Sequence, residues 1–152
     1  MPFRIAKTFT VESGHLLTKH PGACRFPHGH SRTVEVVIAA DTLDEREMVC
    51  DFKAIKQTVS DFVHRFDHSI ALNTRDPHYG DYSEAYGDRV VPFEGEDPTS
   101  EAIARMIFEH VKQALANASK NPVDPLYPVR RSVRLERVRV TETATTWAEY
   151  WE

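Results

Sequence analysis

The chain has 152 residues, a length suited to a single domain covering residues 1–152. Its composition, with 41% hydrophobic and 28% charged residues, is typical of a soluble globular domain, and no apolar run approaches the ~20 residues of a membrane helix. The formal net charge of −4 disfavours a nucleic-acid-binding protein, and because the N-terminus lacks the apolar core of a signal peptide we expect a cytoplasmic protein.

Alternation of polar and apolar residues predicts four strands. They are expected at residues 3–12, 31–40, 132–142 and 145–151, the last two forming a hairpin. In the third strand the apolar phase slips by one position, which predicts a bulge near Glu136 and Arg137.

Two segments in the middle of the chain have a helical period instead. Apolar residues recur every three or four positions across residues 52–66 and 98–117. Asp51 is a good N-cap for the first helix, and Asp97 followed by Pro98 supplies a cap and a first turn for the second. The sequence therefore predicts two amphipathic helices that cover one face of a sheet.

The order of elements is strand, strand, helix, helix, strand, strand. This order predicts an α+β fold, with a four-stranded antiparallel sheet and two helices packed on one face. The connection from residue 73 to 96 is longer than ordinary loops and carries three tyrosines, so we expect it to be functional or mobile, with a short extended piece at 90–93.

Two histidines, His28 and His30, stand at the start of the second strand. Residues two apart in an extended chain project from the same face, so both imidazoles can bind one divalent metal ion. His15 is the best candidate for a third ligand, because antiparallel pairing would place the end of the first strand beside the start of the second. Three neutral imidazoles with one open position are typical of catalytic zinc. The alternative is a pair of polar loop residues.

The two cysteines have different surroundings, and a cytoplasmic setting favours two thiols over a disulfide. Cys24 lies four residues before His28 in a loop with several basic residues. Positive charge favours the thiolate, which can serve as nucleophile or base, although an inert loop cysteine fits the local sequence equally well. Cys50 lies between apolar residues and is expected to be a buried structural thiol.

Two further carboxylates are candidate site residues. Asp67 and His68 follow the first helix, where a carboxylate can set the tautomer of an imidazole, or where both are simply polar residues of a helix end. Glu142 closes the third strand and can clamp a guanidine-like heterocycle with two parallel hydrogen bonds. Taken alone, its position favours a hairpin-turn residue.

The order of these signals is more specific than any one of them. His15, then Cys24-x-x-x-His28-Gly29-His30, then CDF, FDHSIALN, DPTSEAIA and TET together resemble the 6-pyruvoyltetrahydropterin synthase superfamily over residues 3–151. The short spacing between Cys24 and His28 is similar to that of the bacterial branch, the 6-carboxy-5,6,7,8-tetrahydropterin synthases of the queuosine pathway. The insertion at residues 74–95 departs from the family pattern.

This resemblance implies roles for named residues. His15, His28 and His30 match zinc ligands, Cys24 the catalytic cysteine, Asp67 and His68 the rest of the catalytic triad, and Glu142 the pterin-anchoring glutamate. The implied reaction turns 7,8-dihydroneopterin triphosphate into 6-carboxy-5,6,7,8-tetrahydropterin, acetaldehyde and triphosphate. Candidate contacts for the triphosphate are Lys19, His20 and Arg25.

The resemblance also implies a tunnelling fold assembled as a homohexamer, a dimer of trimers with active sites between subunits. Three alternatives remain open. They are a 6-pyruvoyltetrahydropterin synthase that cleaves no carbon–carbon bond, a zinc-binding module without catalysis, and an iron oxygenase that uses two histidines and a carboxylate.

Overall fold

The computed structural model describes residues 1–152 as one α+β domain. The strands are β1 (Phe3–His15), β2 (His28–Ala40), β3 (Ser69–Asn73), β4 (Val90–Phe93), β5 (Arg134–Thr143) and β6 (Thr146–Trp151). The α-helices are α1 (Phe52–His64), α2 (Tyr79–Tyr86) and α3 (Ser100–Lys120), and two 3-10 turns are η1 (Ala23–Arg25) and η2 (Gly87–Arg89).

The sheet has six strands in the order β4-β3-β1-β2-β5-β6. Strands β1, β2, β5 and β6 pair antiparallel, as predicted, whereas β3 and β4 add a parallel extension beside the end of β1. The prediction of a purely antiparallel four-stranded sheet with two helices was therefore wrong. Strand β3 was missed because it is a five-residue run with no alternating pattern, and its burial rises along the run.

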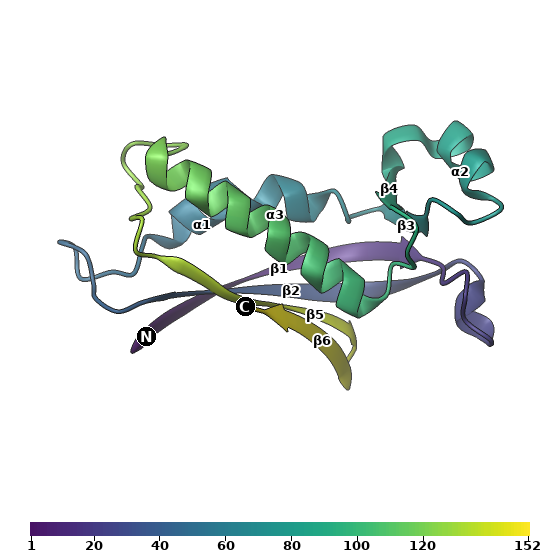
Figure 1. The fold of residues 1–152 in the computed structure, drawn as a ribbon, viewed down its shortest axis with the longest axis horizontal. Coiled ribbons are helices and arrows are strands. Elements are labelled where there is room, and N and C mark those ends of the chain that lie inside the picture. Colours follow the sequence, from purple (N-terminus) through teal and green to yellow (C-terminus); the bar gives the residue numbers. More distant parts are fainter.

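Helices α1 and α3 lie on one face of the sheet, as predicted (Figure 1). Their apolar stripes pack with the inward-facing residues of β1, β2 and β5 in one core of 28 buried residues. Asp51 caps α1 by accepting a hydrogen bond from the Lys53 N–H at 2.8 Å. The cap of α3 is Thr99 rather than the predicted Asp97, because Asp97 accepts instead from the backbone N–H of Lys19 and from the side chain of Asn73.

The β2–β5 register confirms the predicted bulge. Val37 pairs with Arg137 and Ile38 pairs with Leu135, so Glu136 is the extra residue. The bulge restores the inward direction of the apolar side chains on both sides of it. Beyond the bulge, Val34 pairs with Val140. The same register brings the polar residues at the start of β2 beside those at the end of β5.

The segment from residue 74 to 95 is ordered by its own small core. It contains α2 and β4, and Tyr79 and Tyr82 of α2 pack against Leu16, Leu72 and Val90. This packing places α2 beside the loop that follows β1 (Figure 1). Two of the three tyrosines that marked this segment in the sequence therefore hold it against the end of the sheet that carries the histidines, whereas Tyr86 is exposed.

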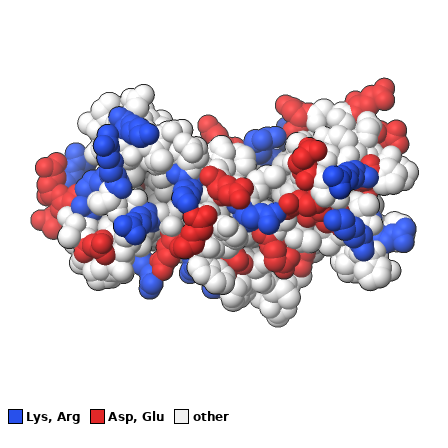
Figure 2. All heavy atoms as spheres, viewed as in Figure 1, with Lys and Arg blue, Asp and Glu red and all other residues white.

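No helix has both the length and the apolar character needed to cross a membrane. Lysine and arginine side chains are interspersed with aspartate and glutamate over the face shown in Figure 2. That face carries no broad basic patch of the kind that nucleic-acid binding requires.

Candidate functional site

The three predicted metal ligands meet at one end of the β1–β2 pair. The register pairs His15 with His28 and Ser13 with His30, so all three imidazoles project from the face that the helices cover. Their ring centroids are 4.4 to 5.1 Å apart, and one ligand nitrogen from each lies within 4.8 Å of the others. Such a cluster brings enough donors together for one metal ion.

Backbone carbonyls fix two of these imidazoles. His15 Nδ1 donates to the Pro98 carbonyl at 2.8 Å, and His28 Nδ1 donates to the Phe26 carbonyl at 2.8 Å. Both rings therefore keep the Nε2 lone pair free, as metal-binding histidines do. The Nε2 atoms of His28 and His30 are buried without a hydrogen-bond partner, which is costly unless a ligand satisfies them. The donor set and these unpartnered nitrogens fit a divalent zinc-like ion.

Burial favours the neutral form of two imidazoles of the cluster, His15 and His30. His15 is fully buried, and burial lowers its pKa from 6.5 to about 4, with Arg32 also lowering it and the Pro98 carbonyl opposing the shift. Burial and then Arg32 also lower the pKa of His30. Neutral imidazole is the form that binds metal, so the site is prepared for an ion at neutral pH.

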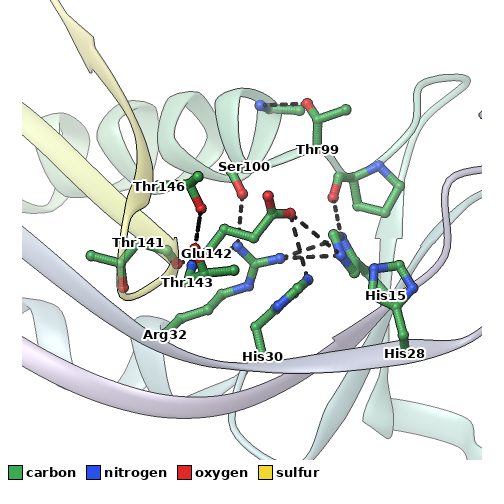
Figure 3. A network of polar contacts seen from close by, with 12 residues as sticks. His15, His28, His30, Arg32, Thr99, Ser100, Thr141, Glu142, Thr143 and Thr146 are labelled. Carbon is green, nitrogen blue, oxygen red and sulfur yellow. Dashed lines mark hydrogen bonds and ion pairs between the residues drawn. The ribbon is translucent and has the colours of Figure 1, made fainter. Parts of the chain in front are cut away.

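A buried arginine, which was not among the predicted site residues, lies beside the cluster. Arg32 is 1% exposed; its Nη1 donates to Ser100 Oγ at 2.8 Å, and its Nη2 lies 3.3 and 3.4 Å from the two ring nitrogens of His15 (Figure 3). These nearly equal distances place the guanidinium over the ring. The sequence did indicate which face of the strand Arg32 occupies, because Arg32 follows His30 at the same two-residue spacing that separates His28 from His30.

Glu142 reaches the cluster from β5. Its Oε1 lies 3.5 Å from His30 Nε2 and 3.8 Å from His15 Nε2, and Figure 3 shows the side chain pointing toward the imidazoles. Its strand register explains this position, since β5 residues two apart from the inward-facing Val140 share its face. Glu142 therefore points inward to the cluster from the end of β5, not outward from the turn.

The two cysteines differ as expected. Cys24 is half-buried in η1, in the loop that joins β1 to β2, and its thiol is not one of the clustered metal donors. Cys50 is buried, and burial raises the pKa of its thiol to about 11. The residues after Cys24 line an open groove of about 680 Å³ whose other wall is formed by α2, including Tyr82.

The candidate triphosphate contacts separate into two grooves. Arg25 lines the groove beside α2. Lys19 and His20 line another groove together with the acidic residues Glu96 and Glu101. Asp76 and Asp81 line the groove beside α2, so both grooves carry acidic residues and neither is favoured over the other for a triphosphate.

Asp67 and His68 form the predicted pair. His68 Nδ1 donates to Asp67 Oδ2 at 2.9 Å, and Asp67 Oδ1 accepts from the Glu12 N–H at 2.8 Å. The Glu12 N–H and then His68 hold the pKa of Asp67 below its usual 3.8. His68 has a φ of 50°, an uncommon left-handed conformation, and its side chain is 74% exposed. Within one chain, no hydrogen bond or ion pair links this pair to Cys24 or to the histidine cluster.

Comparison with known proteins adds independent information. Residues 4–152 match the family model described as 6-pyruvoyl tetrahydropterin synthase. The 6-carboxy-5,6,7,8-tetrahydropterin synthase of Aquifex aeolicus is 34% identical, and the match covers 100% of this chain and 99% of that protein. The enzyme of the same name from Rickettsia bellii is 33% identical over 77% of this chain and 86% of its own length.

Solved structures share the fold at lower sequence identity. An uncharacterized protein from Wolinella succinogenes superposes with a TM-score of 0.75 at 21% identity, covering 99% of this chain and 98% of that one. The 6-pyruvoyl tetrahydropterin synthase of Plasmodium falciparum superposes with a TM-score of 0.67 at 13% identity, covering 99% and 97% of the two chains.

Proposed function

Because this chain belongs to the 6-pyruvoyl tetrahydropterin synthase family, we propose that it is a 6-carboxy-5,6,7,8-tetrahydropterin synthase of 7-deazapurine (queuosine) biosynthesis. The reaction takes 7,8-dihydroneopterin triphosphate and water to 6-carboxy-5,6,7,8-tetrahydropterin, acetaldehyde and triphosphate. The observation that carries this proposal is the cluster of His15, His28 and His30, with two buried ring nitrogens left unpartnered, in a chain whose full-length relatives bear that name.

The imidazoles of His15, His28 and His30 hold the metal ion, for which zinc is the best candidate. When bound, this ion supplies a Lewis acid that polarises the hydroxyl oxygens of the substrate side chain. The Pro98 and Phe26 carbonyls keep two of the ligand rings in the required tautomer.

Cys24 is assigned as the base that removes a proton from the substrate side chain. Its place in the loop that leads into His28 supports this assignment. A thiolate is a competent base when nearby positive charge stabilises it.

His68 is assigned as the partner that exchanges protons on the opposite side of the substrate. Asp67 holds His68 Nδ1, which leaves Nε2 free to give or take a proton. The carboxylate is itself held by the Glu12 N–H, so the imidazole has a fixed orientation. Glu142 is assigned to the pterin ring, where its two oxygens match adjacent ring N–H and amino groups.

The assembly we propose is a homohexamer with sites between subunits, located in the cytoplasm. Besides the short strand β4, two sheet edges lack strand partners: the outer side of β1 before residue 13, and β6. Exposed apolar residues lie on these edge strands, namely Phe3, Trp147 and Trp151. Joining β1 of one subunit to β6 of the next would close a barrel and remove both edges. It would also bring His68 of one chain toward Cys24 of another.

Product analysis tests the proposed function. The zinc-loaded protein is incubated with 7,8-dihydroneopterin triphosphate, acetaldehyde is trapped as a hydrazone, and the pterin product is identified by mass. We expect one acetaldehyde per 6-carboxy-5,6,7,8-tetrahydropterin formed. A 6-pyruvoyl product without acetaldehyde would instead assign the chain to the elimination reaction, and no turnover at all would favour a non-catalytic zinc module.

A further inference from the structure

The spacing between Glu142 and the imidazoles is unusual for a hydrogen bond. Oε1 lies 3.5 Å from His30 Nε2 and 3.8 Å from His15 Nε2, whereas an N–H···O bond has a donor–acceptor distance of roughly 2.7–3.2 Å. Two ligands of a tetrahedral zinc ion, each bound at roughly 2.0–2.1 Å, lie about 3.4 Å apart. The observed spacing therefore suits two ligands of one ion better than a hydrogen-bonded pair.

The tautomers lead to the same conclusion. His15 Nδ1 donates to a carbonyl, so His15 Nε2 carries a lone pair rather than a proton. An ionised Glu142 also offers only lone pairs, and no protein group donates a hydrogen bond to it. Two electron-rich atoms that face each other beside a fully buried ring repel each other, and a cation bound between them would remove that repulsion.

The charge around the site favours an anionic ligand. A divalent ion on neutral imidazoles would lie beside the buried guanidinium of Arg32, and Glu142 is the carboxylate in contact with this cluster (Figure 3). Concentrated positive charge in a buried site is unfavourable unless an anion offsets it. A carboxylate bound directly to the ion offsets the positive charge of the ion. Because Arg32 lies beside the ion, the same carboxylate offsets the charge of Arg32 as well.

We propose that Glu142 is the fourth metal ligand of the resting protein and that the pterin substrate displaces it. This inference rests on the proposed function, in which the same carboxylate holds the pterin ring. Glu142 cannot bind the ion and the ring through the same oxygens, so it must leave the ion when the pterin arrives. Its side chain is 34% exposed and its strand register shifts between Thr141 and Thr143, which gives it room to move.

The consequence is a coupled exchange at the metal. The fourth position stays closed to water and to other ligands until the pterin ring captures the carboxylate. The position then opens next to the substrate side chain. Substrate recognition by Glu142 and opening of the metal site are thus one event.

Cobalt substitution tests this exchange without measuring activity. The wild-type protein, Glu142→Gln and the control Glu136→Gln, a change on the same strand at a carboxylate that pairs with Arg4, are loaded with Co²⁺. Visible absorption reports the ligand set, and titration gives the Kd for Co²⁺. We expect Glu142→Gln to change the spectrum and to weaken Co²⁺ binding by at least about 10-fold, as losses of metal-supporting groups do. Glu136→Gln should match the wild type.

A pterin without a leaving group completes the test. Adding 7,8-dihydroneopterin to the wild-type Co²⁺ protein should alter the spectrum as Glu142 leaves the ion. Identical spectra and Kd values for wild type and Glu142→Gln, with Co²⁺ lost from His28→Ala, would overturn this inference alone. Failure of the wild type to bind Co²⁺, or binding unaffected by His28→Ala, would overturn the metal centre of the proposed function as well.

Discussion

His15 Nδ1 donates a hydrogen bond to the Pro98 carbonyl at 2.8 Å across 83 residues of sequence. Pro98 lies just before α3, whose first residue Ser100 accepts a hydrogen bond from Arg32. The start of this long helix therefore orients a ligand ring and holds the buried cation beside it. Because α3 also packs on the sheet, the geometry of the site and the packing of the core depend on each other.

Zinc is expected to stabilise the fold through this connection. A ligand that binds only the folded state at 100 times its Kd adds about 2.7 kcal/mol, which raises Tm by about 5–10 °C for a chain of this size. Differential scanning fluorimetry of chelator-treated protein, with and without added Zn²⁺, measures the shift. His28→Ala should abolish it, whereas His64→Ala, a change at an exposed helix residue, should keep it.

Cys24→Ala should remove turnover and keep the metal. Loss of a general base lowers kcat by about 10²- to 10⁴-fold, and the thiol is not one of the clustered donors. Product formation and metal content are measured on the same samples. Cys50→Ala is the matched control and should retain turnover, because that thiol is buried in the core. Loss of zinc from Cys24→Ala would instead make the thiol a ligand.

Mixing two inactive variants tests whether sites form between subunits. Cys24→Ala and His68→Ala are co-expressed with different tags, and the mixed assembly is purified. If Cys24 of one chain meets His68 of another, random mixing restores about a quarter of the sites. Activity should therefore return in mixed assemblies and in neither variant alone. No recovery in a verified mixed assembly would mean that both residues of a site come from one chain.

The metal-free protein should lose stability as the pH falls from about 6.5 to 4. The pKa of His15 is about 4 in the folded protein and 6.5 in the unfolded chain, so the unfolded state binds more protons in this window and acid favours unfolding. The total effect of His15 is about 3 kcal/mol, with no contribution above this window. Urea unfolding at several pH values measures the slope. His15→Gln should flatten it, and an equal slope in that variant would assign the effect to other groups.

Thiol labelling distinguishes the two cysteines directly. Burial raises the pKa of Cys50 to about 11, and the side chain is 4% exposed, so the thiol should resist iodoacetamide at pH 8. Cys24 is half-buried and should react first. Peptide mass analysis after a short exposure counts the modified sites. Preferential labelling of Cys50 would contradict the packing of this core.

The antiparallel part of the fold followed from local patterns. Alternation located β1, β2, β5 and β6, and the slipped phase in β5 correctly predicted the bulge at Glu136. The short extended piece predicted at 90–93 is β4, but β3 and the parallel pairing of both strands were not found, because these five- and four-residue runs depend on the β1–β3 and β3–β4 pairings and on the small core beneath α2. Pairing between distant segments leaves little trace in a short stretch of sequence.

The site residues, like the strands, could be predicted from local patterns only in part. Spacing and strand pairing led to His15, His28 and His30, because both depend on the extended geometry of two neighbouring strands. The inward position of Glu142 and the burial of Arg32 depend on how β5 joins the sheet and on where α3 begins. Those are tertiary relationships, so residue type and spacing alone favoured a turn role for Glu142.

An anomalous difference map from crystals of the zinc-loaded protein, collected on both sides of the zinc absorption edge, tests the metal centre most directly. The structure predicts one peak per chain within bonding distance of the Nε2 atoms of His15, His28 and His30. A peak at any other place, or no peak between these imidazoles in protein that contains zinc, would contradict it.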